Sequence, residues 1–310
     1  MSKPALKLKK IYWELTSECY NCCSYCGARD VSHIRNSDKT IKRILNSIVE
    51  YPPDQIQMSG GDPLLVDLDT HKFVVDTLSP TTFCEISVNP KSDINLEILK
   101  LYGLVYISLN TLEEIEKYEI NWKRKLADEN IPVMFATNFN LLNFFLAEKI
   151  SKIVGNAVWK IDFTLYGDPK HTLAIYDQEL ALNKLNSDLS MAGCNNIVIG
   201  NTANCEYCDA GIHSLGLLYD GTVVPCLSMR FWIEIRKKTL GNITQEKLKD
   251  IWYKKFENQR FTEWFCCKNQ CKNKVIDIRK KGIILKELPK QILICDGSWA
   301  TDIVDCFPVD

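Results

Sequence analysis

A chain of 310 residues, 46% of them hydrophobic and 25% charged, is long enough for one large domain with a smaller one appended, and it can bury an ordinary core. A formal net charge of −1 gives no broad basic field, which argues against nucleic acid as a partner. No apolar stretch is long enough to span a bilayer, and the N-terminal lysines are not followed by the apolar region of a signal peptide, so we expect a cytoplasmic protein without membrane association.

The first two thirds of the chain alternates between short apolar runs and helical patterns. The expected strands are 11–16, 55–58, 83–88, 104–109, 133–137, 160–165 and 197–199. Ser37 can cap the first helix, and further helices are expected over 95–102, 113–129, 141–154 and 178–192. This alternation predicts a parallel sheet with right-handed crossovers, and about six such units predict an open or closed barrel.

After about residue 203 the pattern changes, because cysteines become dense and strands become short. We therefore predict two domains, an α/β barrel over 1–203 and a smaller domain over 204–310 that is held partly by metal. The fourteen cysteines of the chain support this division, because so many thiols in a cytoplasmic protein indicate metal or redox chemistry.

The first group of cysteines follows directly on the first expected strand. Cys19, Cys23 and Cys26 have the spacing C-x3-C-x2-C, so one loop can place three thiolates around one iron–sulfur cubane. A [4Fe–4S] cluster normally takes four cysteines, so three would leave one iron open to another ligand. Spacing alone also allows Cys22 as a ligand. The alternative is a structural zinc site, which typically uses paired C-x2-C spacings.

This loop resembles the signature of the radical S-adenosylmethionine (SAM) superfamily, in which an aromatic residue, here Tyr25, precedes the third cysteine. The resemblance implies a partial (βα)6 barrel with SAM bound to the open iron of a [4Fe–4S] cluster. It also implies an enzyme that cleaves SAM reductively to a 5′-deoxyadenosyl radical, which removes a hydrogen atom from the substrate. The protein's part would be to orient the cofactor and exclude water.

Two further segments resemble SAM-binding positions of that superfamily. Gly60, Gly61 and Asp62 follow the second strand in a motif similar to Gly-Gly-Glu-Pro, whose backbone binds the SAM amino group. Ser108 and Asn110 resemble the Ser-x-Asp pattern at the end of the fourth strand. Two more polar residues, Asn89 and Asn138, follow the third and fifth strands, at the edge where parallel sheets bind ligands. Each of these polar residues can equally be an ordinary turn residue.

The second group of cysteines resembles the SPASM/twitch extension of radical SAM enzymes. Asp220-Gly221 predicts a hairpin between Cys208 and Cys226, and Cys267-x3-Cys271 follows. The resemblance implies at least one auxiliary [4Fe–4S] cluster, with Cys208, Cys226, Cys267 and Cys271 as ligands and Cys205 and Cys266 as spare candidates. Cys295 and Cys306 could belong to a second cluster, and structural zinc is the alternative.

Other candidate residues are interpreted as structural. Cys84 and Cys194 stand alone in apolar surroundings and are expected in the core, and the four histidines form no metal-ligand pair.

The resemblance implies a radical SAM enzyme that modifies a ribosomally made peptide and takes electrons from a flavodoxin or ferredoxin. The alternatives are a radical dehydrogenase of a sugar or aminocyclitol, and a non-catalytic iron–sulfur or zinc scaffold. No catalytic residue beyond the cofactor ligands is assigned.

Overall fold

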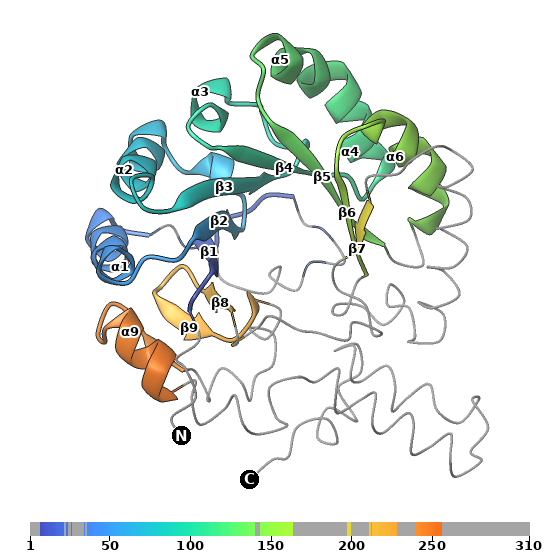
Figure 1. The fold of residues 1–310 in the computed structure, drawn as a ribbon. Coiled ribbons are helices and arrows are strands. Elements are labelled where there is room, and N and C mark those ends of the chain that lie inside the picture. Colours follow the sequence, from blue (N-terminus) through green and yellow to red (C-terminus); the bar gives the residue numbers. More distant parts are fainter. Residues whose placement is uncertain are drawn as a thin grey trace, which may run out of the picture.

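The computed structural model describes residues 7–21, 23, 26, 34, 36–139, 143–163, 197–199, 211, 213–227 and 240–255. In these ranges ten strands form one sheet in the order β10-β9-β8-β1-β2-β3-β4-β5-β6-β7, and helices cover one of its faces (Figure 1). The strands are β1 (Lys10–Thr16), β2 (Gln55–Gly60), β3 (Phe83–Val88), β4 (Leu104–Ser108), β5 (Val133–Phe139), β6 (Trp159–Phe163), β7 (Ile197–Ile199), β8 (Ser214–Leu217), β9 (Thr222–Val224) and β10 (Gly241–Asn242).

The helices follow the strands in alternation as far as β6. They are α1 (Asp38–Glu50), α2 (Leu68–Leu78), α3 (Leu96–Leu99), α4 (Leu112–Lys117), α5 (Lys123–Asp128), α6 (Ala147–Val154) and α9 (Leu248–Asp250). Short 3₁₀ turns lie at η1 (Pro63–Leu65) and η3 (Phe144–Leu146), and π-helical turns at η2 (Tyr118–Trp122) and η5 (Ile251–Lys255).

The sheet is mostly parallel and open. Strands β1 to β7 pair in chain order and in parallel, and the described strands at the two edges, β10 and β7, do not pair with each other. The expected α/β class and partial barrel are therefore confirmed, and the sheet is open rather than closed. The helix expected over 178–192 lies outside the described residues.

Local signals explain where the helices begin and which side they bury. The Ser37 hydroxyl accepts a hydrogen bond from the Thr40 N–H at the start of α1, as expected of an N-cap. The apolar residues of α1 recur at helical spacing and are buried, among them Ile41, Ile44 and Ile48. The helix expected over 113–129 is continuous through α4, η2 and α5.

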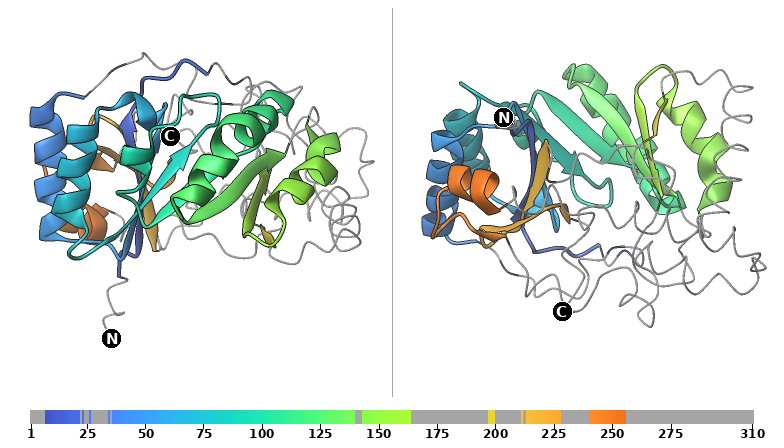
Figure 2. Two further views of the ribbon diagram at one scale, coloured as in Figure 1. Left: turned by 90° about the horizontal axis from the view of Figure 1, so that it is seen from above. Right: turned by 60° about the horizontal axis from the view of Figure 1, so that its bottom comes forward.

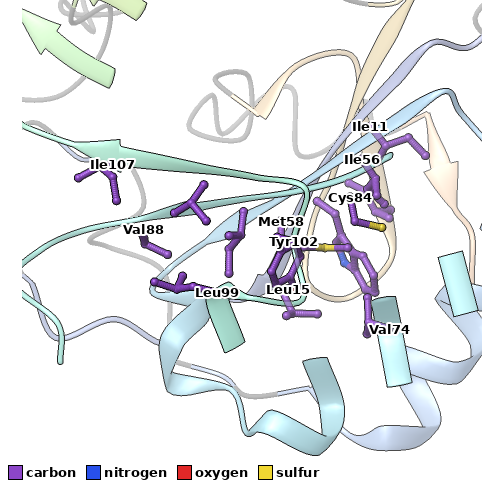
Figure 3. Packing of buried hydrophobic residues seen from close by; sticks show 14 of the residues in the cluster. Ile11, Leu15, Ile56, Met58, Val74, Cys84, Val88, Leu99, Tyr102 and Ile107 are labelled. Carbon is purple, nitrogen blue, oxygen red and sulfur yellow. The ribbon is translucent and has the colours of Figure 1, made fainter. Parts of the chain in front are cut away.

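Alternation along β1 gives the sheet two different faces. Ile11, Trp13 and Leu15 are fully buried in the apolar layer between sheet and helices, part of which Figure 3 shows. The residues between them, Lys10, Tyr12 and Glu14, therefore point to the opposite face, which we call the inner face. The core lies on the helical side, and the inner face is available for polar groups.

Segments beyond residue 213 continue the same sheet. Strand β8 pairs in parallel with β1, with Lys10 opposite Ser214 and Trp13 opposite Leu217. Further along the chain, α9 follows β10 and lies beside α1 (Figures 1 and 2). There the Leu248 N–H donates to the Ser47 hydroxyl at 3.1 Å. The division expected at 203/204 stays a prediction, because the residues around it lie outside the described ranges.

No helix in the described part of the chain has the length and apolar character needed to cross a membrane.

Candidate cofactor site

The first cysteine loop begins where β1 ends, at the carboxyl edge of the sheet. Cys19, Cys23 and Cys26 are each half-buried, and the Cys26 N–H donates to the Cys23 carbonyl at 3.0 Å. The Asn21 N–H donates to the Cys19 sulfur at 3.5 Å. The structure thus places three thiols in one short turn at the end of a strand. Cys22 and Tyr25 lie outside the described residues.

The glycine segment, Gly60–Pro63, packs directly on the start of this loop. The Gly61 N–H donates to the Thr16 carbonyl at 2.8 Å, and the Asp62 N–H donates to the Glu18 carbonyl at 2.7 Å. A Cβ on Gly61 would lie 2.0 Å from that Glu18 oxygen. The close approach therefore requires glycine, and the residue it touches immediately precedes Cys19.

The carboxylate of Asp62 is used inside the protein. It is 4% exposed, and its two oxygens accept from the Leu64 N–H at 3.0 Å and from the Ser92 hydroxyl. Burial raises the pKa of Asp62, while the hydrogen bond from Ser92 opposes that change. The backbone carbonyls of the segment, rather than this side chain, are thus the groups suited to accept from an ammonium group.

Sequence reasoning did not identify Ser92. It lies in the loop after β3, and besides its bond to Asp62 it accepts from the Asn21 side-chain amide at 3.4 Å. Ser92 thereby joins the cysteine loop to the glycine segment. A single serine in a turn carries no signal by which the sequence could have revealed this role.

A buried network joins the ends of β3, β4 and β5. At its centre Glu114, fully buried, accepts from the Asn89 amide at 2.8 Å and from the Asn110 N–H at 2.5 Å. The Asn110 side chain in turn accepts from the Asn138 N–H at 2.7 Å, and Asn143 donates to the Asn110 carbonyl at 2.9 Å. Asn89 and Asn110 thus hold strand ends together, and whether they also contact SAM stays a prediction.

Glu114 and Asn143 were missed, although the pattern Thr111-x-x-Glu114 is the sequence signal of a capping box, which the structure contains. Burial raises the pKa of Glu114, and the hydrogen bond from Asn89 opposes the change.

Ser108 and Asn138 differ from the other expected SAM contacts. They lie on the inner face at the carboxyl edge, where Ser108 is half-exposed and Asn138 is exposed. Of the polar residues expected to face SAM, these two have side chains placed to meet a ligand above the sheet.

The inner face carries charges in pairs. Lys10 of β1 contacts Glu85 of β3 at 2.5 Å, and Lys160 contacts Asp162 at 2.9 Å along β6. The Lys10 ammonium also lies 5.6 Å from the centre of the Tyr106 ring. Burial raises the pKa of Tyr106 to about 12. This face therefore offers both positively charged hydrogen-bond donors and negatively charged acceptors.

The expected hairpin of the C-terminal region is present. Strands β8 and β9 are antiparallel, and Gly221 lies in the turn between them at φ +86°, a conformation that favours glycine. Cys226 follows β9 and is half-buried. Cys226 lies near the inner face, because Gly216, the partner of Tyr12 in β1, would place a Cβ 3.0 Å from the Cys226 carbonyl carbon. Burial raises the pKa of Tyr12, and Lys160 opposes the change. Cys208, Cys267 and Cys271 lie outside the described residues.

Whether these residues fit an iron–sulfur cluster rests on the donor set. Within the described ranges, no three His, Cys, Asp or Glu side chains are gathered around one point. The loop nevertheless offers three thiols, the ligands that such clusters take, held at the end of β1 by the glycine segment. The donor chemistry and the position at the carboxyl edge of the sheet fit the group.

Comparison with known proteins gives one sequence match and several similar folds. Residues 208–273 match SPASM, an iron–sulfur cluster-binding domain. Streptococcus suis SuiB bound to S-adenosylmethionine has a TM-score of 0.65 at 12% identity, over 83% of this chain and 68% of that one. SuiB bound to its precursor peptide SuiA gives 0.64 at 12% identity, over 83% and 67%. Native anSMEcpe with bound AdoMet and the Cp18Cys peptide gives 0.62 at 15% identity, over 84% and 83%.

No curated protein matches the chain by sequence. The chain nevertheless shares the fold of SuiB and anSMEcpe, both of which bind SAM, and joins it to an iron–sulfur cluster-binding region. That region is of the SPASM kind, and it spans all four cysteines expected to hold an auxiliary cluster, Cys208, Cys226, Cys267 and Cys271.

Proposed function

We propose that this protein is a radical SAM enzyme. Cys19, Cys23 and Cys26 would hold the SAM-binding [4Fe–4S] cluster, and the backbone carbonyls of Gly60–Asp62 would accept from the SAM amino group. Ser108 and Asn138 would contact the rest of SAM. When bound, cluster and SAM together supply the 5′-deoxyadenosyl radical that takes a hydrogen atom from the substrate. The chain's own residues would orient SAM and hold the glycine segment against the cysteine loop.

The contact between the glycine segment and the cysteine loop is the observation that carries this proposal. Two backbone hydrogen bonds, to Thr16 and Glu18, connect the segment to the residues just before Cys19. A ligand bound between them would lie beside a cluster held by the three thiols and would also reach the backbone carbonyls of the glycine segment. A zinc scaffold would not need that second surface.

The test compares two cysteine substitutions. After anaerobic reconstitution with iron, sulfide, dithionite and SAM, we expect Cys23→Ala to stop the release of 5′-deoxyadenosine. We expect Cys84→Ala to retain it, because Cys84 is a core residue at 4% exposure on the helical side of the sheet. Release from Cys23→Ala at the rate of the unmutated protein would contradict the ligand assignment.

For the substrate we propose a ribosomally made peptide. Two proteins with similar folds are described with a bound peptide, SuiB with its precursor SuiA and anSMEcpe with Cp18Cys. The paired charges of the inner face also suit a peptide main chain, which has donors and acceptors in equal number. Electrons would come from a flavodoxin or ferredoxin.

The substrate is tested by adding candidate molecules to the reduced holoenzyme. A short peptide encoded beside the gene should be modified, as seen by a mass change, and the modification should weaken in Lys160→Met. The exposed pair Lys152–Glu148 provides the control, since Lys152→Met lies on the helical side and should not matter. Modification of an aminocyclitol but not of the peptide would favour the dehydrogenase alternative, which the polar inner face also accommodates.

A further inference from the structure

We propose that His71 is a positioning residue that holds the glycine segment against the cysteine loop. Sequence reasoning assigned no role to this histidine. The inference rests on the proposed SAM site, because the glycine segment that His71 holds is one side of that site. His71 does not touch the site; it acts through the Pro63 carbonyl.

The imidazole of His71 is fully buried and engaged at both nitrogens. Nδ1 lies 2.6 Å from the Tyr102 hydroxyl, and Nε2 lies 2.9 Å from the Pro63 carbonyl oxygen. The Tyr102 ring packs edge-on against the imidazole, with the ring centres 5.8 Å apart. Figure 3 shows Tyr102 in the apolar layer beneath the sheet.

The contact with Pro63 determines that Nε2 carries a proton. A carbonyl oxygen can only accept, so Nε2 donates toward Pro63; in the neutral ring, which burial favours, Nδ1 accepts from the Tyr102 hydroxyl. This arrangement is the neutral imidazole. It agrees with the direction in which burial moves the pKa of His71, which is downward.

A continuous chain of contacts leads from His71 to the cysteine loop. His71 binds Pro63, the neighbouring Asp62 N–H donates to Glu18, and Glu18 immediately precedes Cys19. The Pro63 carbonyl also accepts from the Val66 N–H at 3.1 Å, so the turn after it can form without His71. Loss of the imidazole should therefore loosen the segment rather than unfold the protein.

The variants must separate positioning from general stability. His71→Leu alone leaves the buried Tyr102 hydroxyl without its acceptor, so the main variant is the double substitution His71→Leu/Tyr102→Phe, which removes both polar partners. His71→Gln keeps an amide donor for Pro63 and serves as the rescue. Thr82→Val is the matched control, because the buried Thr82 hydroxyl also donates to a proline carbonyl, that of Pro53, at 3.0 Å and at the other end of the sheet.

Two measurements report on the segment. The first is hydrogen exchange of the amides of residues 59–66 in the full chain, which requires no cofactor. The second is the equilibrium dissociation constant of SAM on the reconstituted holoenzyme. We expect the double variant to exchange faster and to bind SAM about three- to tenfold more weakly, the factor that one lost hydrogen bond brings. Thr82→Val should change neither, and His71→Gln should recover most of both.

The outcomes are distinguishable. Unchanged exchange and unchanged SAM affinity in the double variant would overturn the proposal, and so would an equal loss in Thr82→Val. If the double variant does not fold, Tyr102→Phe decides by the same two measurements, because it removes the hydroxyl that holds the imidazole: faster exchange and weaker SAM binding would support the proposal, and wild-type values would contradict it. If the unmutated holoenzyme binds no SAM, the proposed function fails, while the exchange measurement still tests what His71 holds.

Discussion

At the scale of single residues, the two loops of the site meet so closely that one methyl group would separate them. Gly61 packs on the Glu18 carbonyl, and its N–H is needed for the bond to Thr16. Glycine here serves the contact between two protein segments. Its role as a surface for SAM, which the resemblance implies, depends on that contact being made first.

We therefore predict that Gly61→Ala lowers both stability and iron binding. A Cβ at 2.0 Å from the Glu18 oxygen forces the loops apart, and overpacking of this kind costs about 1–3 kcal/mol. Urea unfolding and the iron content after reconstitution measure the effect.

Gly155→Ala is the control for the loss of glycine itself. Gly155 has φ +55° but nothing within 4 Å of a Cβ, so only the backbone strain of about 1 kcal/mol applies. Iron binding equal in the two variants would show that the close approach at Gly61 does not matter.

The buried His71 predicts a defined dependence of stability on pH. Its pKa in the folded protein lies below the ordinary value of about 6.5, so between the two values the unfolded state binds more protons. The free energy of unfolding should therefore fall as the pH drops below about 6.5, by at most about 1.4 kcal/mol per pH unit.

The contribution of His71 is obtained by difference. Burial is the largest effect and lowers the pKa of His71. Asp67, which lies near the imidazole, favours its charged form and so makes the difference between the folded and unfolded pKa values smaller. Urea unfolding of wild type and His71→Gln between about pH 5 and 7.5 should show the decline only in wild type. Parallel curves would mean that His71 takes up its proton without unfolding.

At the scale of elements, the site depends on hydrogen bonds that hold the carboxyl ends of β3, β4 and β5 together. Glu114 lies at the start of α4 yet accepts from backbone and side chains at the ends of β3 and β4, and Asn110 extends the connection to β5. The helix thus contributes a buried acceptor to the carboxyl edge of the sheet, where it binds Asn110, two residues after Ser108.

We predict that Glu114→Gln destabilises the protein by about 1–3 kcal/mol, because an amide nitrogen would face the Asn110 and Thr111 N–H groups. The neighbouring Glu113→Gln should change stability by less than about 0.5 kcal/mol, since Glu113 makes exposed ion pairs with Lys91 and Lys117. Thermal unfolding of both variants checks this. Equal effects would show that burial of Glu114 contributes nothing.

At the scale of the whole molecule, the described part of the C-terminal region is built into the sheet. Leu215 and Leu217 of β8 are fully buried beside β1, and Ile251 and Trp252 are fully buried near α1. The hydroxyls of Tyr51 and Tyr253 lie 2.8 Å apart at the same junction. These contacts bury apolar side chains from both sides of residue 203.

A chain ended after residue 203 should therefore not fold as an independent barrel. It would lose these apolar residues and expose the edge of β1, which β8 pairs in the full chain. Calorimetry and size-exclusion chromatography should show aggregation or the loss of a cooperative transition. A cooperative transition near that of the full chain would support the division at 203/204 instead.

The local signals of the sequence were sufficient for much of the fold. Alternating apolar runs predicted β1 to β7 to within a few residues, Ser37 predicted the start of α1, and Asp220-Gly221 predicted the hairpin. The spacing of Cys19, Cys23 and Cys26 sufficed to suggest a cluster. Each of these features depends on neighbours in the chain.

Only the tertiary structure decided which of the expected site residues have partners inside the protein. Asp62, Asn89 and Asn110 are hydrogen-bonded to other parts of the protein, Ser92 and His71 have contacts that no sequence pattern indicated, and Glu114 does more than its capping-box pattern predicts. A buried polar group must find its partner wherever the fold provides one, and those partners come from distant strand ends. Backbone groups at a strand edge need partners too. The sequence of β8 indicates a strand, but only the fold shows that it pairs with the free edge of β1.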